Sequence, residues 1–80
     1  MHESYLLKNL FRYLEKEEKL SAKKLIKIYI SLSELGGISE EHFREHFRNE
    51  VVGTKRESLE IEIKKTPFGP ELEITKLDFV

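Results

Sequence analysis

The first three residues of the chain, Met1-His2-Glu3, bring together nitrogen donors that can bind a divalent metal ion. The imidazole and the amide nitrogen of His2 close one chelate ring around the metal, and the amine of Met1 or the amide of Glu3 closes a second. Deprotonated amides are strong-field planar donors, and nitrogen-rich planar sites favour Ni(II) or Cu(II). The opening therefore predicts a square-planar metal site. A solvated, frayed chain end is the alternative that these three residues alone leave open.

A second group that could hold a metal is the pair His42 and His46. Four residues apart, they lie on one side of a helix, and such a pair can ligate zinc or nickel. The metalloprotease pattern His-Glu-x-x-His is absent, because Phe43-Arg44-Glu45 separates the two histidines. The spacing favours a solvated helix face. It predicts that replacing either histidine leaves the N-terminal site nearly intact.

Composition excludes several classes of function. The chain has no cysteine, so thiolate catalysis, disulfides and cysteine-ligated metals are excluded. Fifteen acidic residues against 14 basic ones give no electrostatic footprint for nucleic acid. No apolar run approaches the roughly 20 residues that span a bilayer, and a signal peptide is not recognisable. With no Ser/His/Asp or paired-carboxylate constellation either, we expect a cytoplasmic protein that is not an enzyme and binds neither nucleic acid nor membrane.

The length and the residue balance indicate one globular domain over residues 1–80. Hydrophobic residues make up 39% of the chain and charged residues 36%, which is typical of a folded domain with a densely charged surface. Abundant Lys, Glu and Arg are also typical of proteins from thermophiles.

Two helices are predicted from apolar residues that recur at three-and-four spacing. The first begins at Glu3 or Ser4 and continues to about Lys19. The second is capped by Ser39 and ends at Gly53. The residues expected to face inward from these helices are Leu6, Leu7, Leu10, Phe11, Leu14, Phe43, Phe47 and Val51.

Three strands are predicted from alternating apolar and charged residues, near residues 26–32, 59–64 and 72–79. In the third strand the inward residues change parity after Ile74, which requires an extra residue and predicts a bulge near Thr75-Lys76. Turn residues at 66–70 predict that the second and third strands form a hairpin. The inward positions expected in the sheet are Ile26, Ile28, Ile30, Leu32, Leu59, Ile61, Ile63, Leu72, Ile74, Leu77 and Phe79.

The resulting order is α-β-α-β-β. Because each strand has one apolar and one charged face, both helices must cover the same side of the sheet. We therefore expect an α/β domain of the α+β type, with two helices packed on one face of a three-stranded mixed sheet. The order of the strands across the sheet stays open.

Several segments together resemble the HypA/HybF family of nickel-insertion metallochaperones for hydrogenase and urease. They are Met1-His2-Glu3 before an amphipathic helix, the sequence Ser-Glu-Leu-Gly-Gly-Ile at 33–38, the second helix before Gly53-Thr54, and the strands at 58–63 and 71–74. The resemblance covers essentially the whole chain. It implies that Met1, His2 and Glu3 bind Ni(II) during maturation of a [NiFe] hydrogenase or another nickel enzyme. It also implies a nickel-handling GTPase and the hydrogenase large subunit as partners, and it leaves a homodimer open.

The chain departs from this family in two places. Family members carry a module with two Cys-x-x-Cys pairs between the last two strands, where this chain has only residues 66–70. Some relatives have a carboxylate where this chain has Ser39, with Glu40 next. The alternative is therefore a divergent, metal-free interaction module that keeps the fold. A more distant alternative is an RNA- or anion-binding domain that uses the lysine-bearing face of the sheet.

Overall fold

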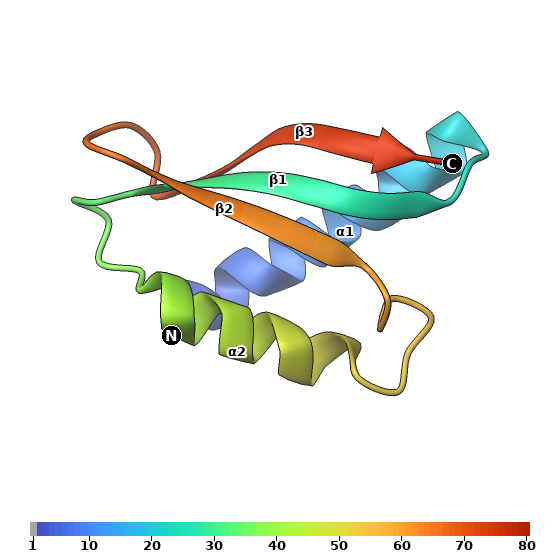
Figure 1. The fold of residues 1–80 in the computed structure, drawn as a ribbon, viewed down its shortest axis with the longest axis horizontal. Coiled ribbons are helices and arrows are strands. Elements are labelled where there is room, and N and C mark those ends of the chain that lie inside the picture. The colour runs from blue at the N-terminus through green and yellow to red at the C-terminus, as the bar shows by residue number, and fades with distance from the viewer. Residues whose placement is uncertain (1) are drawn as a thin grey trace.

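The computed structural model describes residues 2–80, with side chains from residue 5 onward. Five elements follow one another: α1 (His2–Ser21), β1 (Leu25–Ser33), α2 (Glu40–Val51), β2 (Glu60–Thr66) and β3 (Leu72–Phe79). Both helices lie on the same side of the sheet, and α1 begins in the left half of the view, while β3 ends at the right (Figure 1). The predicted α+β fold with a mixed sheet is confirmed.

The helices are held to the sheet by the apolar faces that their spacing predicts. Leu10 and Leu14 of α1 are buried, as are Phe43 and Phe47 of α2. The ring of Phe11 stacks on that of Phe47, with centroids 5.5 Å apart and planes 21° from parallel. This contact joins α1 to α2 directly beneath the sheet.

The start of α2 follows the predicted capping pattern. The Ser39 hydroxyl accepts the backbone N–H of His42 at 3.4 Å, which satisfies one of the amides that a helix leaves without a partner in its first turn. Glu40 and Glu41 follow in that turn, where negative charge is favoured by the helix dipole. Gly53 has a φ of 77° just beyond the last turn, so a residue without a side chain ends the helix there.

The sheet has the order β2-β1-β3, so the expected hairpin between the second and third strands is wrong. Strand β1 runs parallel to β2 and antiparallel to β3, and it separates them. Two strand spacings amount to roughly 9.5 Å, and five extended residues reach roughly 17 Å. The short connection at 67–71 is therefore long enough to cross the C-terminal end of β1 (Figure 1). Backbone hydrogen bonds from Glu34 N–H to Thr66 O (2.8 Å) and from Ser33 N–H to Glu71 O (3.3 Å) hold the crossing in place.

Two irregularities adjust which side chains face the helices. Opposite Tyr29 and Ile30, strand β3 contributes one extra residue, Thr75, and this bulge was predicted from the change of parity. A second irregularity at Ile26 of β1 was not predicted. It turns Ile26 outward, where 40% of its surface is exposed, while Leu25 is buried in its place. The inward placement of Ile26 is therefore wrong.

The core lies between the central strand and the two helices. The inward residues of the edge strands β2 and β3 are only partly buried, because an edge strand has a neighbour on one side alone. Within the described chain, the buried apolar residues are Leu7, Leu10, Leu14, Leu25, Ile28, Ile30, Leu32, Ile38, Phe43, Phe47 and Val51.

Helix α1 has 20 residues, which is about the length that spans a bilayer. Charged residues on its outer face make it amphipathic rather than apolar throughout. In the part of the chain that the structure describes, no helix is both long and apolar enough to cross a membrane.

The connection between α2 and β2 is fastened to α1 by one ion pair. Arg56 Nη2 lies 2.7 Å from Glu18 Oε1, and the two side chains are only 11% and 21% exposed. The other carboxylate oxygen of Glu18 accepts the N–H of Leu25 at 3.1 Å. Within the connection, the Thr54 hydroxyl donates to Val51 O (2.6 Å) and accepts the N–H of Arg56 (3.1 Å). One carboxylate thus links α1, β1 and the loop after α2.

We predict that Glu18→Gln lowers the free energy of unfolding by about 1–3 kcal/mol, because it leaves the half-buried Arg56 guanidinium without its counter-charge. Glu15→Gln is the matched control, since Glu15 pairs with Lys19 at 3.5 Å on an exposed helix face. An exposed pair of this kind contributes about 0.5 kcal/mol or less. Urea unfolding of both variants measures the difference, and equal midpoints would contradict the assignment.

We also predict that the domain folds without metal. Its apolar core is continuous, and no group of three His, Cys, Asp or Glu residues among the described ones is arranged to hold an ion. Treatment with a chelator should therefore leave the circular dichroism spectrum and the melting temperature unchanged. A loss of helix signal or a lower melting temperature in chelator would reveal a metal needed for folding.

Candidate metal centre

The predicted metal ligands fall at the beginning of α1. His2 and Glu3 are its first two residues, while Met1 and the side chains of residues 2–4 lie outside what the structure describes. The first four backbone N–H groups of an α-helix have no acceptor within the helix. The amide nitrogens of His2 and Glu3 are therefore not needed to hold α1 together, and a metal ion bound to them would break none of its hydrogen bonds.

The first turn of α1 continues without interruption into a well-packed helix. Leu7 is 4% exposed and belongs to the apolar core, and Leu10 and Leu14 follow on the same side. Only four residues separate His2 from Leu7. His2 and Glu3 therefore belong to a helix that packs on the core from Leu7 onward, with no loop between them and the packed residues.

Beside this first turn lies a surface hollow of about 390 Å³ between α1 and α2, here called the terminal hollow. Its lining residues are Tyr5, Leu7, Lys8, His46 and Glu50. His2 precedes Tyr5 by three residues, which is about 4.5 Å along the helix axis and nearly one turn. The packing of the two helices therefore brings His46 near the beginning of α1, a proximity that the sequence gave no reason to expect.

The other polar residues near the start of α2 are arranged differently. His42 is exposed and is not among the described residues that line the terminal hollow. Glu40 is held on its own helix, with its carboxylate 3.0 Å from Nε of Arg44. Neither residue is connected to α1 by a hydrogen bond or ion pair in the described part of the chain. Of the predicted histidine pair, the structure brings only His46 to the terminal hollow.

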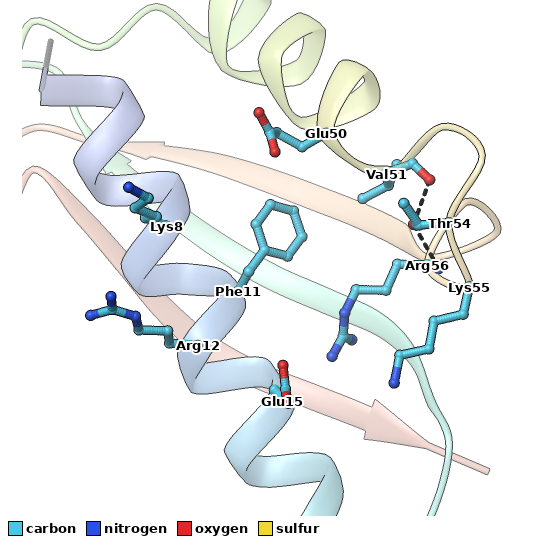
Figure 2. Close-up of a pocket in the computed structure, with 9 residues that line it drawn as sticks. All are labelled: Lys8, Phe11, Arg12, Glu15, Glu50, Val51, Thr54, Lys55 and Arg56. Carbon is cyan, nitrogen blue, oxygen red and sulfur yellow. Dashed lines mark hydrogen bonds between the residues drawn. The ribbon is translucent and has the colours of Figure 1, made fainter.

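A second hollow, of about 420 Å³, continues from the first one along α1 and is here called the basic groove. Figure 2 shows side chains of α1, the end of α2 and the following loop around it. Four basic and two acidic residues line it, with Phe11 and Val51 as its apolar part. Sequence reasoning missed this groove because its basic residues come from distant segments. The only signal was the four-residue spacing of Lys8 and Arg12 on α1. The lining residues are Lys8, Phe11, Arg12, Glu15, Glu50, Val51, Thr54, Lys55 and Arg56.

The face of the sheet opposite the helices is polar, and Lys27 and Lys76 on it are each paired with an acidic residue. The ring of Tyr29 lies under the ammonium groups of Lys27 and Lys76, at 4.9 and 5.1 Å, and its hydroxyl donates to Asp78 at 2.8 Å. The hydrogen bond to Glu62 raises the pKa of Lys27, so this lysine remains charged and paired near neutral pH. Because both Lys27 and Lys76 are paired with acids, these two lysines give no support to an anion site on this face.

No protein-family model matches this chain, and no curated protein or solved structure matches it either. The case for its function therefore rests on the residues and on the fold. That fold is a small α+β domain whose first helix begins at His2, and Tyr5, Leu7 and Lys8 of this helix line a hollow shared with the second helix.

Proposed function

We propose that this protein binds Ni(II) through Met1-His2-Glu3 and carries it to a partner that matures a [NiFe] hydrogenase or another nickel enzyme, as its resemblance to the HypA/HybF family implies. Nickel is then the cargo of the protein rather than a structural cofactor. The observation that carries the proposal is the position of His2 and Glu3 in the first turn of α1, where the backbone N–H groups have no helical acceptor.

The geometry of a square plane limits what the chain start can supply. In such a plane each donor has two adjacent neighbours. The His2 amide nitrogen forms one chelate ring with its own imidazole and another with either the Met1 amine or the Glu3 amide. It is therefore the middle one of three donors in a row, and one position in the plane remains open. An open position suits a carrier, because a receiving protein can attach its own ligand there before the others are released.

Electrostatics at the start of α1 favours this kind of binding. The N-terminal end of a helix carries a partial positive charge, which stabilises a deprotonated and therefore anionic amide nitrogen. Each deprotonated amide also cancels one positive charge of Ni(II). Because amide and imidazole donors must lose protons to bind, metal binding should release protons and weaken in acid.

We predict that untagged protein starting at Met1 binds one Ni(II) per chain near neutral pH and gives a yellow, diamagnetic, square-planar complex. Affinity should fall steeply below about pH 6.5, where free imidazole becomes protonated. His2→Ala should abolish the complex. Isothermal titration together with the visible spectrum measures both effects, and an unchanged stoichiometry and spectrum in His2→Ala would exclude His2 from the site.

A matched control moves the chain start without changing any residue of the domain. Adding residues before Met1 converts its amine into an ordinary amide and should weaken nickel binding. The folded domain should not change, because the core begins at Leu7. Equal affinity with and without the extension would mean that the Met1 amine is not a ligand.

The basic groove favours the second candidate function, a metal-free interaction module. Among the described side chains, Lys8, Arg12 and Lys55 have no carboxylate oxygen within 4.0 Å. These cations line the groove together with Phe11 and Val51, a combination of charge and apolar surface that suits an acidic protein segment. A folded, untagged protein that binds no Ni(II) would favour this candidate over the carrier.

A further inference from the structure

We propose that the basic groove binds a short acidic segment of another protein. Carboxylates of this segment pair with Lys8, Arg12 and Lys55, and one apolar residue of the segment packs on Phe11. All residues that line the groove belong to the part of the chain whose side chains the structure describes. The binding involves no metal ion, so it goes beyond the nickel-carrying function and applies to a carrier and to a metal-free module alike.

The groove concentrates positive charge on a chain that is slightly negative as a whole. The net charge of the chain is −1 at pH 7, whereas four basic and two acidic residues line the groove, an excess of two positive charges. One charge of each sign is already neutralised within the protein, since Arg56 pairs with Glu18 at 2.7 Å and Glu15 with Lys19 at 3.5 Å. The excess is therefore carried by the other three cations of the lining.

These three cations are Lys8, Arg12 and Lys55. All three are exposed, and none has a carboxylate oxygen within 4.0 Å among the described side chains. Carboxylates of a bound segment would supply the missing counter-charges through charge-assisted hydrogen bonds. The lining carboxylate of Glu50 repels a uniform polyanion such as a nucleic-acid backbone, whereas a peptide can place a neutral residue beside it. The balance of charge thus favours an acidic peptide over a nucleic acid.

The apolar part of the groove gives such a segment a place to anchor. Phe11 is half-buried, with its ring stacked on Phe47 of α2, and Val51 beside it is almost fully buried. In Figure 2 the ring of Phe11 lies between the α1 backbone and the loop that carries Lys55. An aromatic or aliphatic side chain that covers this ring removes apolar surface from water, and anchors of this kind carry much of the binding energy of an interface.

The loop that supplies Lys55 is held in place before any partner binds. Thr54, the residue before Lys55, donates its hydroxyl to Val51 O at 2.6 Å. Arg56, the residue after it, is tied to α1 through Glu18. Because both neighbours of Lys55 are fastened, binding does not have to order this loop, and the entropic cost of binding is lower.

The dimensions of the groove limit the bound segment to a few residues. On α1 the lining extends from Lys8 to Glu15, which are seven residues apart. This separation is about 10 Å along the helix axis. An extended chain covers it with about three residues. One apolar residue with acidic residues on either side is therefore the segment that the groove fits best.

The experiment measures, by fluorescence anisotropy in the presence of a chelator, how the full chain binds a labelled peptide in which aspartates and glutamates flank one phenylalanine. Arg12→Gln combined with Lys55→Gln should weaken binding by about tenfold or more, which corresponds to about 1.4 kcal/mol. The matched control combines Lys23→Gln with Lys64→Gln, since both lysines are exposed and neither lines the groove. It removes the same charge and should change the affinity less than about twofold, because salt screens distant charges.

The peptide itself provides the test of the apolar anchor, so that Phe11 need not be changed and the packing of the helices stays intact. A peptide with alanine in place of its phenylalanine should bind about tenfold more weakly, because it has no side chain to cover the Phe11 ring. Equal binding of the two peptides would overturn the contact with Phe11.

The remaining outcomes decide whether the groove is the binding site. An absence of peptide binding, or an equal loss in both double variants, would overturn the proposal. Single-stranded RNA of the same length, bound more tightly than the peptide, would overturn it in favour of a nucleic acid. Equal melting temperatures of the parent and both double variants would show that lost binding is not lost fold. Since the chelator removes metal, none of these outcomes depends on whether the protein binds Ni(II).

Discussion

The stacking of Phe11 on Phe47 is the contact on which the rest of the functional surface depends. Each ring comes from the apolar face of a different helix, and their contact fixes both the spacing and the rotation of α1 against α2. The terminal hollow lies on one side of this contact, and the basic groove reaches Phe11 itself. A change of rotation by one residue in either helix would separate His46 from Tyr5 and Lys55 from Arg12. One aromatic pair thus determines which polar side chains can act together.

The sheet provides the platform for this pair and is itself constrained by its small size. With three strands, only β1 has neighbours on both edges, so it carries the fully buried residues Ile28, Ile30 and Leu32. The parallel pairing of β1 with β2 requires α2 to cross from one end of the sheet to the other. The apolar residues of α2 pack in the same core as those of α1, so both helices cover one face. The topology of the strands and the contact between the helices are therefore two parts of one arrangement.

The sequence predicted those parts of the fold that local periodicity determines. The element order, the Ser39 cap, the inward faces of both helices and the bulge at Thr75 all follow from the spacing of neighbouring residues. The strand order did not, because a five-residue connection is long enough for a hairpin or for a crossing over β1. The irregularity at Ile26 also escaped, since two adjacent apolar residues, Leu25 and Ile26, fit either inward position.

The candidate site, like the fold, could be predicted from the sequence only in part. The donor set at the chain start can be recognised from sequence, because its chemistry involves consecutive residues. The proximity of His46 to the beginning of α1 could not be recognised, because it arises from the packing of residues that are forty positions apart in the chain. Donors on consecutive residues can be recognised from a sequence, whereas the proximity of side chains on two helices becomes apparent only with the fold.

The opposite placement of the two ends of the domain has a practical consequence. The molecule extends 35 Å along its longest axis, and along this axis α1 begins in the left half of the view, while β3 ends at the right (Figure 1). Val80 is held there by a pair of backbone hydrogen bonds to Lys24 at the start of β1. An affinity handle or fluorescent label joined after Val80 would therefore lie far from the first turn of α1. Such a fusion allows the protein to be purified, immobilised or followed by fluorescence while its amino end stays chemically unaltered.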